Sequence, residues 1–347
     1  MKKKLFKICS LLLTLCVFAS VAFGCGATAF NRHTEAQTKF LAGSYLLSMD
    51  VNGKAEESRP LPIVLSMETK KSGYNIVIEL KDGEKKLVEK LTGNSFSYYN
   101  SELGREYIWY LTDEDGEKIG SEKRFLTSDV APRNLYVDGV TNCRDLGGWK
   151  VAGGKRVKQG MIYRTARFSE DETGEKQITD AGIKTLKDEL GVKTELDLRL
   201  AGDNAENGGL TESPLGPDVN YISVPMVTGG NYFQRNLDVL PEVFAVFGKK
   251  ENYPIAFHCS IGTDRTGVIA FLISAMLGVE KDSLYKDYLF SNFGLIGGKR
   301  SFTTIDGYLE EIEKASGEAL ADKTYNYLVG CGVSSSTLDL MRSMLIE

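Results

Sequence analysis

Hydrophobic and polar positions follow two different patterns, and the change between them falls near residue 130. Before it, short apolar segments with period-two alternation are separated by turn signals such as Asn-Gly and Asp-Gly, at spacings near ten residues. Such a series predicts a small all-β sandwich over residues 39–128. The seven predicted strands cover residues 44–51, 61–67, 74–80, 86–91, 95–99, 107–112 and 123–127.

After a proline-containing linker at residues 129–133, strand-like and helix-like segments alternate. Strands are expected at residues 191–199, 221–225 and 253–257, and helices at 178–186, 237–247 and 268–273. Four further amphipathic helices are expected at 281–290, 303–315, 323–329 and 334–346. This alternation predicts an α/β domain with a parallel sheet over residues 133–347. In such sheets ligands bind at the carboxyl ends of the strands.

The first 25 residues have the features of an export signal: a lysine-rich start, an apolar stretch at residues 11–23, and small residues before Cys25. Residues 22–25 resemble a bacterial lipobox, which implies lipidation of Cys25 and attachment to the membrane, with plain secretion as the alternative. Residues 26–38 are small and polar and are expected to be a tether, with His33 as a solvated residue of it. The protein is therefore expected outside the cytoplasm, as a cell-surface lipoprotein or a secreted protein.

Composition narrows the function. The formal net charge is −5 and no run of Lys or Arg follows the first seven residues, so no nucleic-acid partner is expected. With only two histidines in the sequence, a histidine-rich metal site is not expected. No cofactor is expected either. Three of six cysteines lie in the signal segment, and the other three (Cys143, Cys259, Cys331) make no disulfide framework. Cys143 is expected to be a small structural residue of a loop, and the alternative is a reversible disulfide between Cys143 and Cys259.

Residues 258–267, HCSIGTDRTG, carry the chemistry. An apolar strand before them and an apolar helix after them predict a loop whose backbone N–H groups converge with the helix dipole on an oxyanion. Cys259 in that ring should be a thiolate nucleophile, Arg265 should grip two phosphate oxygens, and the Thr266 hydroxyl should donate to the sulfur. The remaining loop residues, Ser260, Ile261, Gly262, Thr263 and Gly267, are predicted to surround the phosphate. His258 is expected to order the loop from behind.

This stretch resembles the phosphate-binding loop of the cysteine-dependent protein tyrosine phosphatase superfamily, His-Cys-x5-Arg-Thr-Gly. Its ending is similar to that of the bacterial secreted tyrosine and phosphoinositide phosphatases, whose loop reads HCxxGKDRTG. Residues 142–148, 162–165 and 197–199 resemble other signatures of that family, so the resemblance spans about residues 135–347. Residues 100–109 resemble a corner of fibronectin type III or immunoglobulin-like domains. The resemblance implies hydrolysis of phosphomonoesters through a cysteinyl-phosphate, without a metal.

The leaving group needs an acid. The Trp-Pro-Asp tripeptide that many superfamily members use is missing, and the resemblance assigns acid catalysis to Asp264 inside the loop. Alternatively, Asp264 only orients Arg265, and Asp238 or Asp203 supplies the proton from a mobile segment. Arg144 and Asp145 are expected to form an ion pair that braces a turn near the site, and Arg199 ends a strand beside it.

Thr263 stands where the HCxxGKDRTG loop of the bacterial secreted phosphatases has lysine. Loss of that cation moves the expected substrate from phosphoinositides or inositol phosphates toward protein phosphotyrosine or a small phosphomonoester. A phosphate-dependent binding module is the rival from another class of function.

Overall fold

The computed structural model describes residues 29–46, 51–67, 73–202 and 205–347. Its main sheet has six strands in the order β11-β10-β12-β9-β8-β7. The first four of these run parallel, and β8 and β7 extend the sheet in antiparallel fashion. The strands are β7 Arg133–Asn134, β8 Arg144–Asp145, β9 Ile162–Thr165, β10 Thr194–Asp197, β11 Asn220–Ser223 and β12 Ile255–His258. The predicted α/β class is confirmed.

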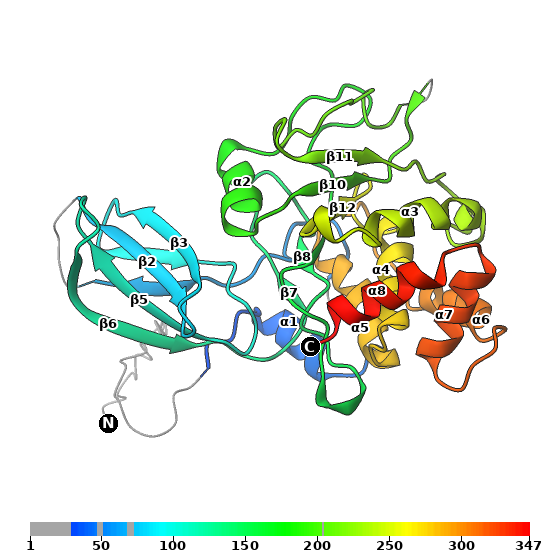
Figure 1. The fold of residues 1–347 in the computed structure, drawn as a ribbon, viewed down its shortest axis with the longest axis horizontal. Helices are drawn as coiled ribbons and strands as arrows, with labels where there is room; N and C mark the ends of the chain where they lie inside the picture. The colour runs from blue at the N-terminus through cyan, green and yellow to red at the C-terminus, as the bar shows by residue number, and fades with distance from the viewer. Residues whose placement is uncertain (1–28, 47–50, 68–72, 203–204) are drawn as a thin grey trace, which may run out of the picture.

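Helices cover both faces of this sheet. On one face Ile255 and Phe257 of β12 join a large core with the C-terminal helices, and on the other Ala256 packs with Leu186 and Leu190 behind α2. Figure 1 shows these C-terminal helices gathered on the side away from α2. They are α3 Leu240–Phe247, α4 Arg265–Met276, α5 Lys281–Phe290, α6 Thr303–Ile312, α7 Leu320–Gly330 and α8 Ser335–Leu345.

One helix on each face, α4 and α2, shows how the sequence specifies its elements. Every residue of α4 is buried, as the unbroken apolar run after the motif requires. On the opposite face, α2 Asp180–Lys184 begins at Thr179, whose hydroxyl accepts from the N–H of Gly182, which is the threonine cap that the sequence predicts. A π-helical turn, Thr185–Glu189, continues α2.

The strands before residue 130 form two antiparallel sheets around a separate core that includes Ile76, Tyr107 and Phe125. Six of the seven predicted segments contain a strand. The strands are β1 Ile63–Ser66, β2 Asn75–Leu80, β3 Lys85–Lys90, β4 Ser95–Tyr98, β5 Glu106–Thr112 and β6 Lys118–Leu126. β1 pairs with β4, and the other sheet has the order β3-β2-β5-β6. Figure 1 shows this β-rich part beside the main sheet and its helices.

The chain before β1 differs from the prediction. Residues 35–42, which the sequence assigned to the end of a tether and the start of the sandwich, form helix α1 Glu35–Ala42, capped by Thr34. Phe40 and Leu41 of this helix pack in the large core of the main sheet, and His33 is buried, so it is not a solvated linker residue. The described part of residues 44–51 contains no strand. The prediction failed because α1 covers the neighbouring domain, which its own short pattern does not reveal.

Residues 51–58, which precede β1, run along the C-terminal domain. The N–H of Gly53 donates to the carbonyl of Asn292, the N–H of Ile296 to that of Gly53, and the N–H of Glu57 to that of Phe293. We call residues 51–58 the strap. It joins the N-terminal part of the chain to the loop that follows α5.

The predicted signal segment and Cys25 lie outside the described residues. Among the residues that the structure does describe, no helix has the length and apolar character needed to span a bilayer.

Candidate active site

The motif occupies the predicted position in the sheet. His258 ends β12 between Asp197 of β10 and Thr165 of β9, at one level of the sheet. Cys259 follows, and α4 begins at Arg265. The loop between them therefore lies at the carboxyl edge of the parallel strands, facing the N-terminus of a fully buried helix.

Side chains hold the backbone of this loop from outside. The Asn142 amide donates to the carbonyls of Ile261 (3.0 Å) and Gly262 (3.2 Å), and Arg164 also donates to Gly262 (2.9 Å). Arg167 donates to the carbonyl of Ser260 (3.3 Å). With these carbonyls turned outward, the peptide N–H groups between them are available to the centre of the loop, as an anion cradle requires.

Gly262 has no substitute in this turn. Its φ of +67° is unfavourable for other residues, and a Cβ there would lie 2.2 Å from the carbonyl oxygen of Thr165. The loop is therefore packed directly on the end of β9.

The Cys259 thiol is buried, with 2% of its surface exposed. Burial opposes its ionisation, but the positive charge of Arg265 and the hydroxyl and N–H of Thr266 outweigh that effect, so the pKa of Cys259 lies below its ordinary value. The Thr266 hydroxyl is buried and has no hydrogen-bond partner of good geometry among the described residues. Its influence on Cys259 comes from proximity to the sulfur.

Arg265 reaches back over the loop from the first turn of α4. Its guanidinium donates to Ser260 Oγ (3.3 Å) and to the carbonyls of Leu198 and Met226 (3.3 Å each). It also forms an ion pair with Glu206, with 2.5 Å between Nη1 and Oε2. Burial lowers the pKa of Arg265, while Cys259 and Glu206 raise it by a larger amount in total. Arg265 therefore stays charged beside the thiol.

Asp264 turns away from the loop. Both of its carboxylate oxygens accept from Arg300, at 2.8 Å from Nε and 2.8 Å from Nη2. Asp264 occupies the N-cap position of α4, yet its side chain makes no capping hydrogen bond there. Thr263 is fully buried, and its hydroxyl accepts from Asn142 (3.1 Å). The side chain of Thr263 therefore lies under the loop and not at the mouth of a pocket.

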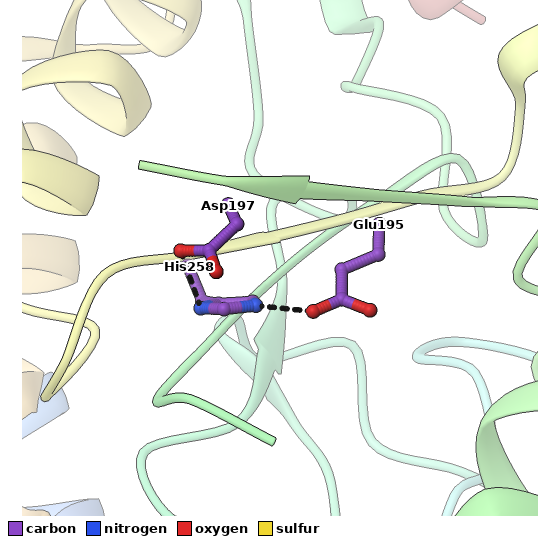
Figure 2. Close-up of side chains that lie close together, drawn as sticks. All are labelled: Glu195, Asp197 and His258. Carbon is purple, nitrogen blue, oxygen red and sulfur yellow. Dashed lines mark hydrogen bonds and ion pairs between the residues drawn. The ribbon is translucent and has the colours of Figure 1, made fainter. Parts of the chain in front are cut away.

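Behind the loop, His258 lies between two carboxylates (Figure 2). Its Nε2 is 2.9 Å from Glu195 Oε1, and its Nδ1 is 3.7 Å from Asp197 Oδ1 and 3.2 Å from the carbonyl of Cys259. Burial lowers the pKa of His258, but Asp197 and Glu195 raise it by more, so that it lies above its ordinary value. The two carboxylates thus favour the protonated form of His258 directly behind Cys259.

The same three residues could hold a metal by distance alone, because their ligand atoms lie within 4.8 Å of one another. Hydrogen bonds already use these atoms: Asp197 accepts from Arg199 (2.7 Å at Nη2) and Tyr221 (3.1 Å), and Glu195 accepts from Ser213. We interpret the cluster as a hydrogen-bonded support for the loop.

The predicted ion pair between Arg144 and Asp145 is wrong. These neighbours point to opposite faces of β8. Arg144 binds Asp287 (2.9 Å) and Asn142 Oδ1 (2.7 Å), whereas Asp145 binds Arg133 (2.9 Å) and the N–H groups of Gly147 and Gly160. Only Arg144 supports the catalytic loop, through Asn142. Arg199 holds Asp197 behind His258.

The alternative acids and the second cysteine lie elsewhere. Asp238 is exposed on the 3₁₀ helix Gln234–Val239, and Asp203 lies outside the described residues. Cys143 packs in the core behind α2, whereas Cys259 belongs to the core on the other face of the sheet. Both thiols are free.

Four important neighbours of the loop carry no role in the sequence-based prediction: Asn142, Arg164, Glu206 and Arg300. The first two lie in signatures that the sequence identified, at residues 142–148 and 162–165, so their positions were noted without their contacts. Arg164 and Arg144 also share Asp287, at 2.6 Å and 2.9 Å. Glu206 and Arg300 belong to no recognised motif.

Residues 135–347 match the model of the tyrosine phosphatase family. The chain belongs to this family. The match begins after the linker and includes every residue of the loop and of the supports described above. The family assignment thus agrees with the resemblance that the motif predicts.

Relatives extend the comparison. A protein of Cupriavidus necator, provisionally named a tyrosine-protein phosphatase, is 29% identical over 188 residues, which cover 46% of this chain and 63% of that protein. A tyrosine-protein phosphatase of Nostoc commune is 30% identical over 139 residues, which cover 35% of this chain and 47% of that one. The chain thus spans about half to two thirds of the length of these relatives.

Among solved structures, the catalytic domain of the PP-IP phosphatase SIW14 from S. cerevisiae matches with a TM-score of 0.33 and 16% identity. It covers 52% of this chain and 90% of that one. P. aeruginosa TpbA matches with a TM-score of 0.27 and 18% identity, over 55% of this chain and 90% of that one.

Proposed function

We propose that this protein hydrolyses phosphomonoesters, most directly protein phosphotyrosine, through a cysteinyl-phosphate on Cys259. The observation that supports this most strongly is the buried thiol of lowered pKa, held at the N-terminus of α4 under the charged Arg265. The thiolate would attack phosphorus, so that an S–P bond forms while the bond to the leaving oxygen breaks. Water would then cleave the S–P bond and release phosphate and the thiolate.

Asp264 is our candidate for the proton transfers, with a restriction that the geometry adds. Its carboxylate accepts from two nitrogens of Arg300, and a carboxylate is the kind of group that can take a proton from the attacking water. Protonation of the leaving oxygen in the first step would require Asp264 to leave Arg300. Thr266, beside the sulfur, would help the thiolate to depart.

The central test is a comparison of wild type with Cys259→Ser on p-nitrophenyl phosphate in the presence of a chelator. Hydrolysis should persist with chelator and fall to background in C259S. Cys331→Ser is the matched control, since Cys331 directly follows α7, outside the loop, and burial raises its pKa. Activity that survives in C259S, or that depends on a divalent metal, would contradict the cysteine mechanism.

An inositol-phosphate or phosphoinositide substrate is the second candidate. Inositol phosphates are not disfavoured by the missing lysine at position 263, because Thr263 is buried. A cation near the end of the loop comes from Arg300 instead. The rates on phosphotyrosine peptides and on inositol phosphates decide between these two. A phosphate-dependent binding module would instead bind phosphate tightly without forming phosphocysteine, which trapping and mass spectrometry of Cys259 would reveal.

For the N-terminal part we propose export and attachment through lipidated Cys25, and a fibronectin type III or immunoglobulin-like origin for the β-rich part. Two antiparallel sheets around one core support the second proposal. Metabolic labelling with a fatty acid, compared between wild type and Cys25→Ser, tests the first.

A further inference from the structure

The Asp264 carboxylate and the Arg300 guanidinium form a bidentate ion pair at the end of the loop. Asp264 directly precedes Arg265, and 15% of its side chain is exposed, against 26% of that of Arg300. Surface ion pairs of single contacts contribute little, but this pair is bidentate and mostly buried. The pair is therefore expected to contribute more than an exposed surface ion pair does.

Arg300 is held in place from several directions. Its third guanidinium nitrogen donates to the carbonyl of Gly298 (2.9 Å). Its backbone N–H donates to Asn292 Oδ1 (2.7 Å), and its carbonyl accepts from Asn292 Nδ2 (3.0 Å). The strap fixes Asn292 in turn, through the N–H of Gly53 (3.0 Å). The guanidinium is thus pre-positioned to receive one carboxylate.

Without Arg300, the Asp264 carboxylate would have another place to go. An aspartate at the N-cap accepts from N–H groups of the first helical turn when its backbone is extended; the backbone of Asp264 is helical (φ −83°, ψ −70°), so such a cap would need a rotation about its ψ. Here that turn belongs to α4, and the same N–H groups and those of the loop form the proposed phosphate cradle. A carboxylate that capped α4 would occupy donors that the phosphate needs, and its charge would repel a dianion.

We propose that Arg300 is a positioning residue for phosphate: it draws the Asp264 carboxylate away from the N-terminus of α4 and neutralises it, so that the cradle accepts a dianion. The charge of Asp264 also works against the thiolate, because it raises the pKa of Cys259. Arg300 thereby keeps a necessary carboxylate near the site without allowing it to block the site. The proposal rests on the phosphate-binding role of the loop.

The test measures binding of inorganic phosphate by calorimetry to wild type, Arg300→Met, Asp264→Asn and the double variant. R300M should bind phosphate about tenfold or more weakly, since the released carboxylate competes with it. D264N should bind at least as tightly as wild type. The double variant R300M/D264N should return to within about threefold of wild type, because the competing charge is gone.

That rescue separates the proposal from a scaffolding role. If R300M/D264N binds phosphate as weakly as R300M, Arg300 acts as a direct ligand or as a brace for its loop, and the proposal is overturned. Unchanged binding in R300M overturns it as well. Arg300→Lys, which keeps the charge but cannot pair in a bidentate manner, should lie between wild type and R300M, and circular dichroism verifies that each variant folds.

The control for the underlying function is wild type itself. If wild type binds and hydrolyses phosphomonoesters while R300M behaves like it, only the role of Arg300 fails. If wild type neither binds phosphate nor hydrolyses p-nitrophenyl phosphate, the proposed function fails and this proposal fails with it.

Discussion

The floor and the rim of the candidate active site are built in opposite ways. The floor is one contiguous stretch from β12 into α4: the backbone of residues 259–266 with the side chains of Cys259, Arg265 and Thr266. It contains a glycine whose Cβ would overlap the end of β9. The rim brings together Asp264, Arg300, Glu206 and the strap, which are separated by up to about 250 residues in the chain. Local sequence therefore specifies the floor, and tertiary packing specifies the rim.

This difference has a chemical counterpart. In the floor, burial raises the pKa of Cys259, but Arg265 and Thr266 together lower it by more. In the rim, carboxylates face the cations, with Glu206 on Arg265 and Asp264 on Arg300. We infer that the floor supplies the nucleophile and the cradle, while the rim sets which anion can enter and how easily.

The largest effect is expected at Gly262 of the floor. Alanine there must move the loop away from the carbonyl of Thr165, 2.2 Å from the new Cβ, in addition to adopting a φ of +67°. Displacement of a catalytic loop by about 1 Å can cost on the order of 10²-fold in rate, so kcat/KM of Gly262→Ala on p-nitrophenyl phosphate should fall by at least that much.

Gly153→Ala is the matched control for this variant. Gly153 has a φ of +77° but no atom within 4 Å of its would-be Cβ. It should lose about 1–2 kcal/mol of stability from the strained backbone alone and keep its activity. Equal activities of the two variants would show that the packing of the floor is not what catalysis needs.

The sequence was sufficient for the elements whose information is local. The run from Ile255 through α4 has a strand, two glycines and an unbroken apolar helix in one stretch, so the site's place at the sheet edge followed from pattern alone. The same holds for α5, whose observed bounds equal the predicted ones, and for the Thr179 cap of α2.

What the sequence could not supply were partners distant in the chain. Arg144 and Asp145 are adjacent, which suggested an ion pair, but strand geometry sends their side chains to opposite faces, toward Asp287 and Arg133. Arg300 follows two glycines with no periodic signal, and only the fold brings it to Asp264. Helix α1 was missed for the same reason, since its apolar residues serve another domain's core.

The second prediction concerns the ionisation of Cys259. Because its pKa is lowered in the folded protein, its thiolate should form, and iodoacetamide should react, at a lower pH than the ~8.5 of an ordinary cysteine. Alkylation of the folded protein, followed peptide by peptide with mass spectrometry from pH 5 to 9, measures this midpoint. Arg265→Met should move it upward, because the neighbouring positive charge is lost.

Cys143 and Cys331 provide internal controls in the same experiment. Burial raises the pKa of both thiols, so neither should react appreciably at pH 6.5. If the alkylation midpoint of Cys259 is not below that of Cys331, the floor does not favour the thiolate. The electrostatic difference between floor and rim is then contradicted.

The smallest expected effect tests whether the strap belongs to the rim. Glu56 Oε2 accepts from the N–H of Asn142 (3.3 Å) and of Leu295 (3.2 Å), so one carboxylate joins a support of the floor to the loop that carries Arg300. Glu56→Gln keeps the shape but loses the charge that strengthens both hydrogen bonds, which should cost about 1 kcal/mol of unfolding free energy in urea titrations. KM should rise a few-fold, with kcat nearly unchanged, because the loop of Arg300 becomes less well held.

Glu57→Gln is the control. Glu57 is an exposed neighbour whose backbone N–H donates to this loop, and its variant should stay within about 0.5 kcal/mol of wild type. A KM that is equal in both variants would place the strap outside the rim, and a fall in kcat alone would tie Glu56 to the floor through Asn142 instead.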